Sequence, residues 1–154
     1  MPALKQPSLT EPLRDLYDRD FYEWCVRTAQ SIRARRVSDF DWEHMAEEIE
    51  DLGKRDYREL HRRLRLTIIH LLKGQFQPCQ RSPSWKSTIR LQRAEVAGIL
   101  SQSPSLRPRI LDALRHVYPE ALQNAIDETG ISPDSFPAAC PYSVDQLTDP
   151  DYWP

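Results

Sequence analysis

Residues 42–73 read WEHMAEEIEDLGKRDYRELHRRLRLTIIHLLK, and their apolar side chains recur at steps of three and four. That spacing puts them on one face of an α-helix, so we expect one long helix that the other helices enclose. The apolar positions are Trp42, Met45, Ala46, Ile49, Leu52, Gly53, Leu60, Leu64, Ile68, Leu71 and Leu72. Gly53 costs about 1 kcal/mol in a helix interior and can bend the helix. Gly74 is the predicted stop.

Polar residues fall at or beside the same apolar face. Asp56, Arg63 and His70 are spaced by seven, so they stack along one side of the helix. Buried charges need partners, and Arg93, on the apolar face of the next helix, should either extend its charged end to solvent or meet a carboxylate. Three interpretations stay open: ordinary ion pairs at the rim of the core, a small polar pocket, or a metal site. The candidate residues are Glu48, Asp56, Arg63, His70, Lys73 and Arg93.

The rest of the chain predicts three further helices. The first runs from Asp15 or Asp20 to about Arg35, with Asp20 in the capping position. The third begins at Pro83 after a Ser82 cap. The fourth follows Ser103-Pro104-Ser105 and ends before Gly130, and Pro119 should kink or interrupt it. The short connections between these helices favour antiparallel neighbours.

We therefore predict an all-α fold, an antiparallel bundle of four main helices. Residues 1–14 form an irregular lead-in, and residues 15–154 form a single helical domain. Within that domain, residues 131–154 make a proline-rich tail whose aromatic residues pack on the bundle. In this tail, Ser143 and Gln146 are spaced to cap one short turn of helix.

The composition limits the classes of protein to consider. The chain has 154 residues, 40% of them hydrophobic and 29% charged, as in soluble globular domains. It has no apolar run of the roughly 18 residues that a membrane span needs. It opens without an apolar signal segment, so we expect cytoplasmic residence and no membrane contact. The three cysteines, Cys25, Cys79 and Cys140, are far apart and should be free thiols.

Charge is distributed unevenly along the chain. Residues 37–52 carry seven acidic and no basic groups, while residues 53–115 carry 14 basic and four acidic groups. A basic 53–115 region could bind nucleic acid. However, residues 116–154 add seven acidic groups and no basic ones, so the acidic segments can fold over the basic region. Aromatic residues are not interleaved with the basic ones, which further disfavours nucleic acid.

No motif for catalysis was found. A di-iron bundle needs two Glu-x-x-His units, and the nearest approach is Asp41-x-x-His44. His44 and Glu48 lie one turn apart and predict a pair that faces solvent. There is no phosphate-binding loop, nucleophile elbow or zinc spacing. We therefore expect no metal and no cofactor, and we favour a protein that is not an enzyme.

Several landmarks occur in an order that resembles a bacterial family known as domain of unknown function 29. They are Asp20-Phe21-Tyr22-Glu23-Trp24, Ala46-Glu47-Glu48-Ile49-Glu50-Asp51-Leu52-Gly53, His70-Leu71-Leu72-Lys73, Trp85 and Ile89 through Arg93, Pro104-Ser105-Leu106 and Cys140-Pro141-Tyr142. The likeness spans residues 15–154. It implies a mostly helical fold and assigns no activity.

These observations leave three functional hypotheses. The first is a protein-interaction module that binds a protein partner or associates with itself. The second is a small-ligand binder or enzyme that uses a groove containing Glu48, His70 and Arg93. The third is nucleic-acid binding through the 53–115 region. A large exposed apolar patch would favour the first, and a concave pocket holding His70 and Arg93 would favour the second.

Overall fold

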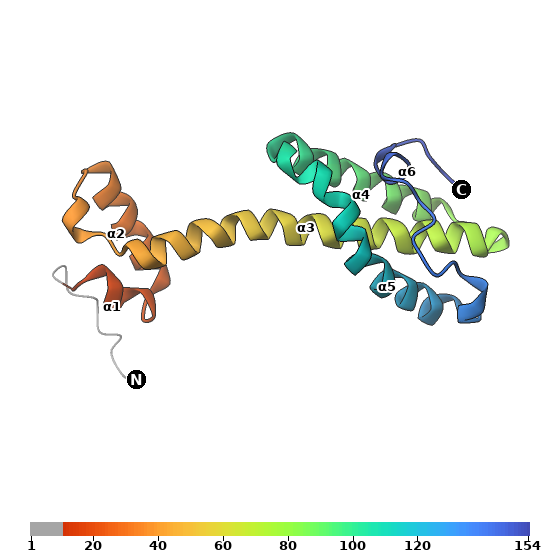
Figure 1. Ribbon diagram of the computed structural model, residues 1–154, viewed down its shortest axis with the longest axis horizontal. Coiled ribbons are helices and arrows are strands. Elements are labelled where there is room, and N and C mark those ends of the chain that lie inside the picture. Colours follow the sequence, from red (N-terminus) through yellow and green to blue (C-terminus); the bar gives the residue numbers. More distant parts are fainter. Residues whose placement is uncertain (1–10) are drawn as a thin grey trace. The chain divides into compact units, whose positions relative to one another are not determined.

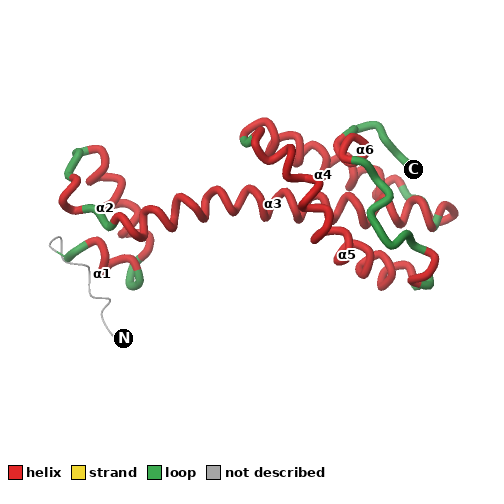
Figure 2. The backbone as a smooth tube through the Cα atoms, viewed as in Figure 1, coloured by secondary structure: helices red, strands yellow, loops and turns green. Residues whose placement is uncertain are grey.

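The computed structural model describes residues 11–154, which contain helices and no strand (Figures 1 and 2). The helices are α1 (Leu13–Tyr17), α2 (Phe21–Arg33), α3 (Trp42–Phe76), α4 (Pro83–Gln102), α5 (Ile110–Thr129) and α6 (Val144–Thr148). Four of them are long, so the predicted all-α helical bundle is confirmed. Of the predicted lead-in, residues 1–10 lie outside the described part, and α1 begins within the remainder at Leu13.

The chain divides into two compact units, one ending at Gly53 and the other running from Lys54 to Pro154. The boundary falls inside α3, which is helical throughout its length. An added Cβ at Gly53 would meet nothing within 4 Å, so no backbone packs closely against this position. The single domain proposed for residues 15–154 stays a prediction.

The first unit contains α1, α2 and the beginning of α3. Its small core consists of Leu13, Leu16 and Trp24, with Met45 of α3 packed against it. Of the two predicted starts of the first helix, Asp20 is correct: α2 begins after it, and its side chain accepts a hydrogen bond from the backbone N–H of Glu23, while α1 is a separate short helix. This cap satisfies one of the free N–H groups at the start of α2, as the sequence predicted.

The second unit holds the larger core, to which α3, α4, α5 and the tail all contribute. Five side chains of α3 are completely buried there: Leu60, Leu64, Ile68, Leu71 and Leu72. α4 contributes Ile89 and Val96, and α5 contributes a row of small and branched side chains that allows close packing. The core predicted for this part of α3 is therefore confirmed.

The proline-rich tail packs on the second unit, as predicted. Phe136, Tyr142 and Leu147 are buried in the core. Ser143 and Gln146 form a capping box at the start of α6, each side chain bonding the backbone N–H of the other. The tail therefore belongs to the folded unit because both its apolar side chains and its backbone have partners.

The predicted helix stop at Gly74 and the predicted interruption at Pro119 are wrong, whereas a kink at Pro119 stays a prediction. α3 continues past Gly74 to Phe76, and Gly74 is buried against the ring of Trp153, where an added Cβ would lie 2.9 Å from a ring carbon. α5 continues through Pro119. Proline removes a single backbone N–H, and the burial of Val117 and Ala121 on either side keeps the helix in place.

The enclosure of the whole apolar face of α3 is also wrong. Trp42, Ile49 and Leu52 keep 58%, 65% and 55% of their surface exposed. In the first unit, only Met45 of this face packs on the core. The short α1 and the single long helix α2 supply too few apolar side chains to cover more of it.

Candidate functional site

The polar residues predicted along α3 in the second unit each have a partner, but the partners differ. Arg63 donates to Glu59 on its own helix and to Gln92 on α4, at 2.8 and 3.1 Å. Asp56 accepts from Ser103 at 3.2 Å, and Lys73 pairs with Glu128 of α5 at 2.6 Å. The Nδ1 of His70 bonds the Leu66 carbonyl of the preceding turn at 2.9 Å. Asp56, Arg63 and Lys73 therefore connect α3 to different segments, while His70 bonds within α3.

Arg93 does not meet the expected carboxylate. Its side chain is buried, with 3% of the residue exposed, and its three nitrogens donate to backbone carbonyls of the tail. The acceptors are Leu147 at 3.1 Å and Gln146 and Tyr152 at 2.6 Å. Burial lowers the pKa of Arg93, and Asp149 opposes this effect. Arg93 therefore fastens the tail, because it donates to carbonyls in the last turn of α6 and to the carbonyl of Tyr152 beyond it.

Glu48 lies in the first unit and is bonded there. It accepts a hydrogen bond of 2.5 Å from the hydroxyl of Tyr17, which raises the pKa of Tyr17 to about 12. The ring of Tyr17 stacks on His44, with 3.8 Å between ring centroids. His44 bonds Asp41 at 2.5 Å, and this bond raises the pKa of the histidine. The predicted His44–Glu48 pair is therefore replaced by two pairs with other partners.

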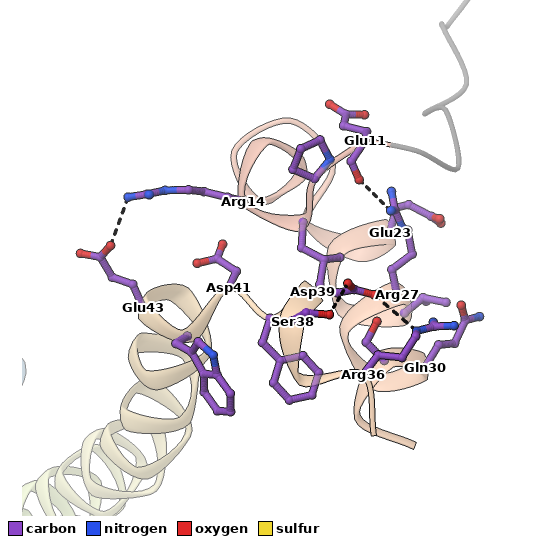
Figure 3. Close-up of a pocket in the computed structure, with 16 residues that line it drawn as sticks. Glu11, Arg14, Glu23, Arg27, Gln30, Arg36, Ser38, Asp39, Asp41 and Glu43 are labelled. Atoms are coloured by element: carbon purple, nitrogen blue, oxygen red, sulfur yellow. Dashed lines mark hydrogen bonds and ion pairs between the residues drawn. The ribbon is translucent and has the colours of Figure 1, made fainter. Parts of the chain in front are cut away.

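The first unit also contains a wide hollow of about 1020 Å³, lined by sixteen residues between positions 11 and 43 (Figure 3). Its charged side chains include opposite pairs: Arg14 with Glu43 at 3.3 Å, and Arg36 with Asp39 at 3.4 Å. Trp42 lines the same hollow. The exposed apolar face of α3 therefore begins at the edge of this depression.

The exposed apolar face belongs to a segment that is rich in acidic residues. Trp42, Ile49 and Leu52 are separated by seven and three residues, so they share one side of α3. We name these three residues the α3 stripe. Glu50, which is exposed, lies on the Trp42 side of the helix surface, Glu43 and Glu47 lie on the opposite side of α3, and residues 37–52 contain no lysine or arginine. Such a surface can bind an apolar segment that carries positive charge.

Features typical of enzymes are few in the described residues. Between positions 11 and 154, no group of three or more His, Cys, Asp or Glu side chains is arranged to hold a metal ion. The three cysteines are free, and burial raises the pKa of Cys25 and of Cys140. A raised pKa keeps a thiol protonated and unreactive. In the same part of the chain, no helix combines the length and apolar character of a membrane span.

The described part of the chain is thus an all-α protein with a buried helical core and one exposed apolar helix face. A family model, described as domain of unknown function DUF29, matches residues 16–153. Since the match covers nearly the whole chain, the protein belongs to this family, whose function is unassigned. Comparisons with curated proteins and with solved structures found no match.

Sequence reasoning missed two features of the surface. The α3 stripe has the same periodicity as the buried positions that follow it, so the spacing gave no warning of its exposure. A basic cavity also forms around Arg58, Arg62 and Arg65 in the second unit. The signal for this cavity was present, because positions 58, 62 and 65 are separated by four and three residues and share one helix face.

Proposed function

We propose that this protein is a non-enzymatic protein-interaction module, and that the α3 stripe binds an apolar, positively charged segment of a partner protein. The observation that carries the proposal is the exposure of more than half of the surface of Trp42, Ile49 and Leu52. Scattered exposed apolar residues are ordinary on protein surfaces. Three on one helix face, beginning with a tryptophan, form the kind of apolar anchor that protein interfaces use.

The charge of the segment that carries the α3 stripe indicates what kind of partner it binds. The segment that carries the stripe has seven acidic and no basic residues between positions 37 and 52. A second copy that placed the same segment against it would bring like charges together, which costs free energy at an interface. An amphipathic partner helix with lysine or arginine beside its apolar residues gains both apolar burial and charge complementarity. We therefore commit to a basic amphipathic partner.

The hypothesis of a catalytic or ligand-binding groove has less support. Glu48 is bonded to Tyr17, and the Nδ1 of His70 to a backbone carbonyl. The donors of Arg93 are engaged by the tail. The small cavity that Arg93 lines, about 100 Å³, does not include His70 among its lining residues. A site that used these groups would first have to break contacts that hold the fold.

A synthetic amphipathic helix made of leucine and lysine serves as the probe, with fluorescence anisotropy as the measurement. We expect the full chain to bind it, and the Ile49→Gln/Leu52→Gln variant to bind about tenfold more weakly, since truncating interface anchors costs above 1 kcal/mol. The matched control is Leu91→Gln/Leu111→Gln, because Leu91 and Leu111 are 56% and 65% exposed but lie in the second unit. The control should bind like the unchanged chain.

Equal binding by both variants, or no binding by the unchanged chain, would contradict the proposal. Sedimentation of the same proteins supplies a second readout. If the unchanged chain forms a dimer that the Ile49→Gln/Leu52→Gln variant cannot form, a second copy occupies the stripe and the basic partner is the wrong occupant.

A further inference from the structure

A small cavity opens between α3 and α5 in the second unit, away from the residues of the α3 stripe. Its volume is about 170 Å³, which equals roughly five or six water molecules in the liquid. Its polar lining is predominantly basic, with three arginines and two histidines against one glutamate. These residues are Arg58, His61, Arg62, Arg65, His116 and Glu120.

The three arginines differ in how far their charge is already neutralised. Arg65 pairs with Glu120 and Arg62 with Glu59, each at 2.8 Å. Arg58 is exposed and forms no hydrogen bond or ion pair with any of residues 11–154. The cavity therefore has one guanidinium with all its donors available, and positive charge exceeds negative charge around it.

The two histidines add a polar atom that lacks a partner. The Nε2 of His61 is enclosed by the protein and has no hydrogen-bond partner, while its ring contacts Tyr57 edge-on with 4.3 Å between centroids. Burial lowers the pKa of His61, and the positive charge of His116 lowers it further, against the opposing effect of Glu120. His116 is exposed on α5, so its side chain is free to change rotamer. Such an unpaired buried nitrogen is uncommon in native proteins.

We propose that this cavity binds the phosphate group of a small anionic ligand. The planar guanidinium of arginine presents several N–H donors in a geometry that matches phosphate oxygens. Arg58 supplies the available donors, and Arg62 and Arg65 add positive charge on the same helix face. Once a neighbouring side chain moves and opens access to the Nε2 of His61, that nitrogen can donate to an anion oxygen, either in the protonated ring or in the Nε2–H tautomer. The volume is sufficient for a phosphate group.

A nucleic-acid backbone offers the same phosphate chemistry, but the cavity fits it less well. Binding of single strands uses aromatic side chains on which bases stack, along a groove that follows several phosphates. Here the only aromatic ring described at the cavity besides the histidines is Tyr57, and it faces His61. The arginines also converge on one small cavity. A single phosphate group on a small molecule is therefore the ligand we assign.

Binding should strengthen as the pH falls. The titratable groups at the cavity are His61 on α3 and His116 and Glu120 on α5, beside the permanently charged arginines. An anion favours the protonated histidines, so by linkage protonation favours the anion. Sulfate is the appropriate probe for this effect because its charge is constant between about pH 6 and pH 8, whereas phosphate itself titrates in that range.

The experiment follows backbone amide signals of residues 58–65 and 116–120 by NMR while sodium sulfate or sodium phosphate is added at constant ionic strength. We expect the signals to shift saturably, with a higher affinity for the anion at pH 6 than at pH 8. Arg58→Ala should bind the anion at least threefold more weakly, since a charge-assisted hydrogen bond is lost. The matched control, Arg55→Ala, removes the same charge from an exposed position of α3 outside the cavity. It should bind like the unchanged chain.

Two results would overturn the proposal. One is the absence of saturable shifts with either anion. The other is an equal loss in Arg58→Ala and Arg55→Ala, which would mean that only general positive charge attracts the anion. A third arm adds a fluorescent duplex DNA and a single strand. If either nucleic acid binds more tightly than phosphate and loses affinity in Arg58→Ala but not in Arg55→Ala, the ligand is a nucleic acid and the small-molecule assignment is wrong.

Discussion

Two stretches of α3 have the same apolar periodicity but differ in how far their apolar side chains are buried. Between positions 60 and 72, five leucines and isoleucines are completely buried beneath α4, α5 and the tail. Between positions 42 and 52, Trp42, Ile49 and Leu52 stay more than half exposed. Periodicity therefore shows which side of a helix is apolar. What covers that side depends on how much apolar surface the rest of the chain brings to it.

The largest expected difference between the two stretches is in stability. Leu64→Ala removes a fully buried side chain from the core of the second unit, and we expect the free energy of unfolding to fall by about 2–5 kcal/mol. Ile49→Ala on the same helix should change it by less than about 0.5 kcal/mol, because Ile49 is exposed. Chemical denaturation of both variants measures this. A similar decrease in the free energy of unfolding for both variants would mean that the side chain of Ile49 is buried.

The next largest expected effect is a loss of stability when the tail, which covers the buried stretch of α3, loses its hydrogen bonds to Arg93. Arg93→Met removes three hydrogen bonds to tail carbonyls and leaves those carbonyls without their donors. We expect a loss of about 2–3 kcal/mol, accompanied by faster proteolysis within residues 143–154. Arg90→Met, at an exposed position one turn earlier on α4, is the control. An intact, protease-resistant tail in Arg93→Met would show that apolar contacts alone hold it.

The smallest effect lies at the boundary between the two stretches. Gly53→Ala adds a methyl group that meets nothing within 4 Å, at a position inside a continuous helix. Alanine favours the helix over glycine by about 1 kcal/mol, so amide hydrogen exchange of neighbouring residues should slow up to about fivefold. Gly130→Ala is the contrasting case, because Gly130 has a φ of 67° and alanine there is strained. Faster exchange in Gly53→Ala would contradict a helical conformation at this boundary.

The sequence was sufficient for the helices and for the second core. The periodicity of residues 60–72, the Asp20 cap and the Ser143–Gln146 capping box are local signals, and each appears as predicted. Interactions between distant residues were harder to predict. Arg93 was expected to reach solvent or to meet a carboxylate, since the sequence does not show which backbone carbonyls of the tail lack a donor. Asp56, Arg63 and His70 were grouped by their spacing of seven along one helix. This spacing could not give their separate partners.

For the same reason, the sequence alone did not reveal either of the two proposed binding sites. An exposed apolar face and a buried one have the same spacing, so only coordinates distinguish them. The basic cavity needs both Arg58 on α3 and His116 on α5, which are 58 positions apart in the sequence. Counting charges along residues 53–115 found the excess of positive charge. It could not place His116, which lies just beyond that region, beside the arginines.

Gly74 has a consequence for the evolution of this fold. The indole of Trp153 occupies the space that a side chain at position 74 would need, and the side chains of Arg81 and Lys86 each lie 5.4 Å from the centre of that ring. A larger residue at position 74 therefore requires the indole of Trp153 to move. Among relatives, the two positions should vary together, and a chain that gains a methyl group at the first should carry a smaller residue at the second.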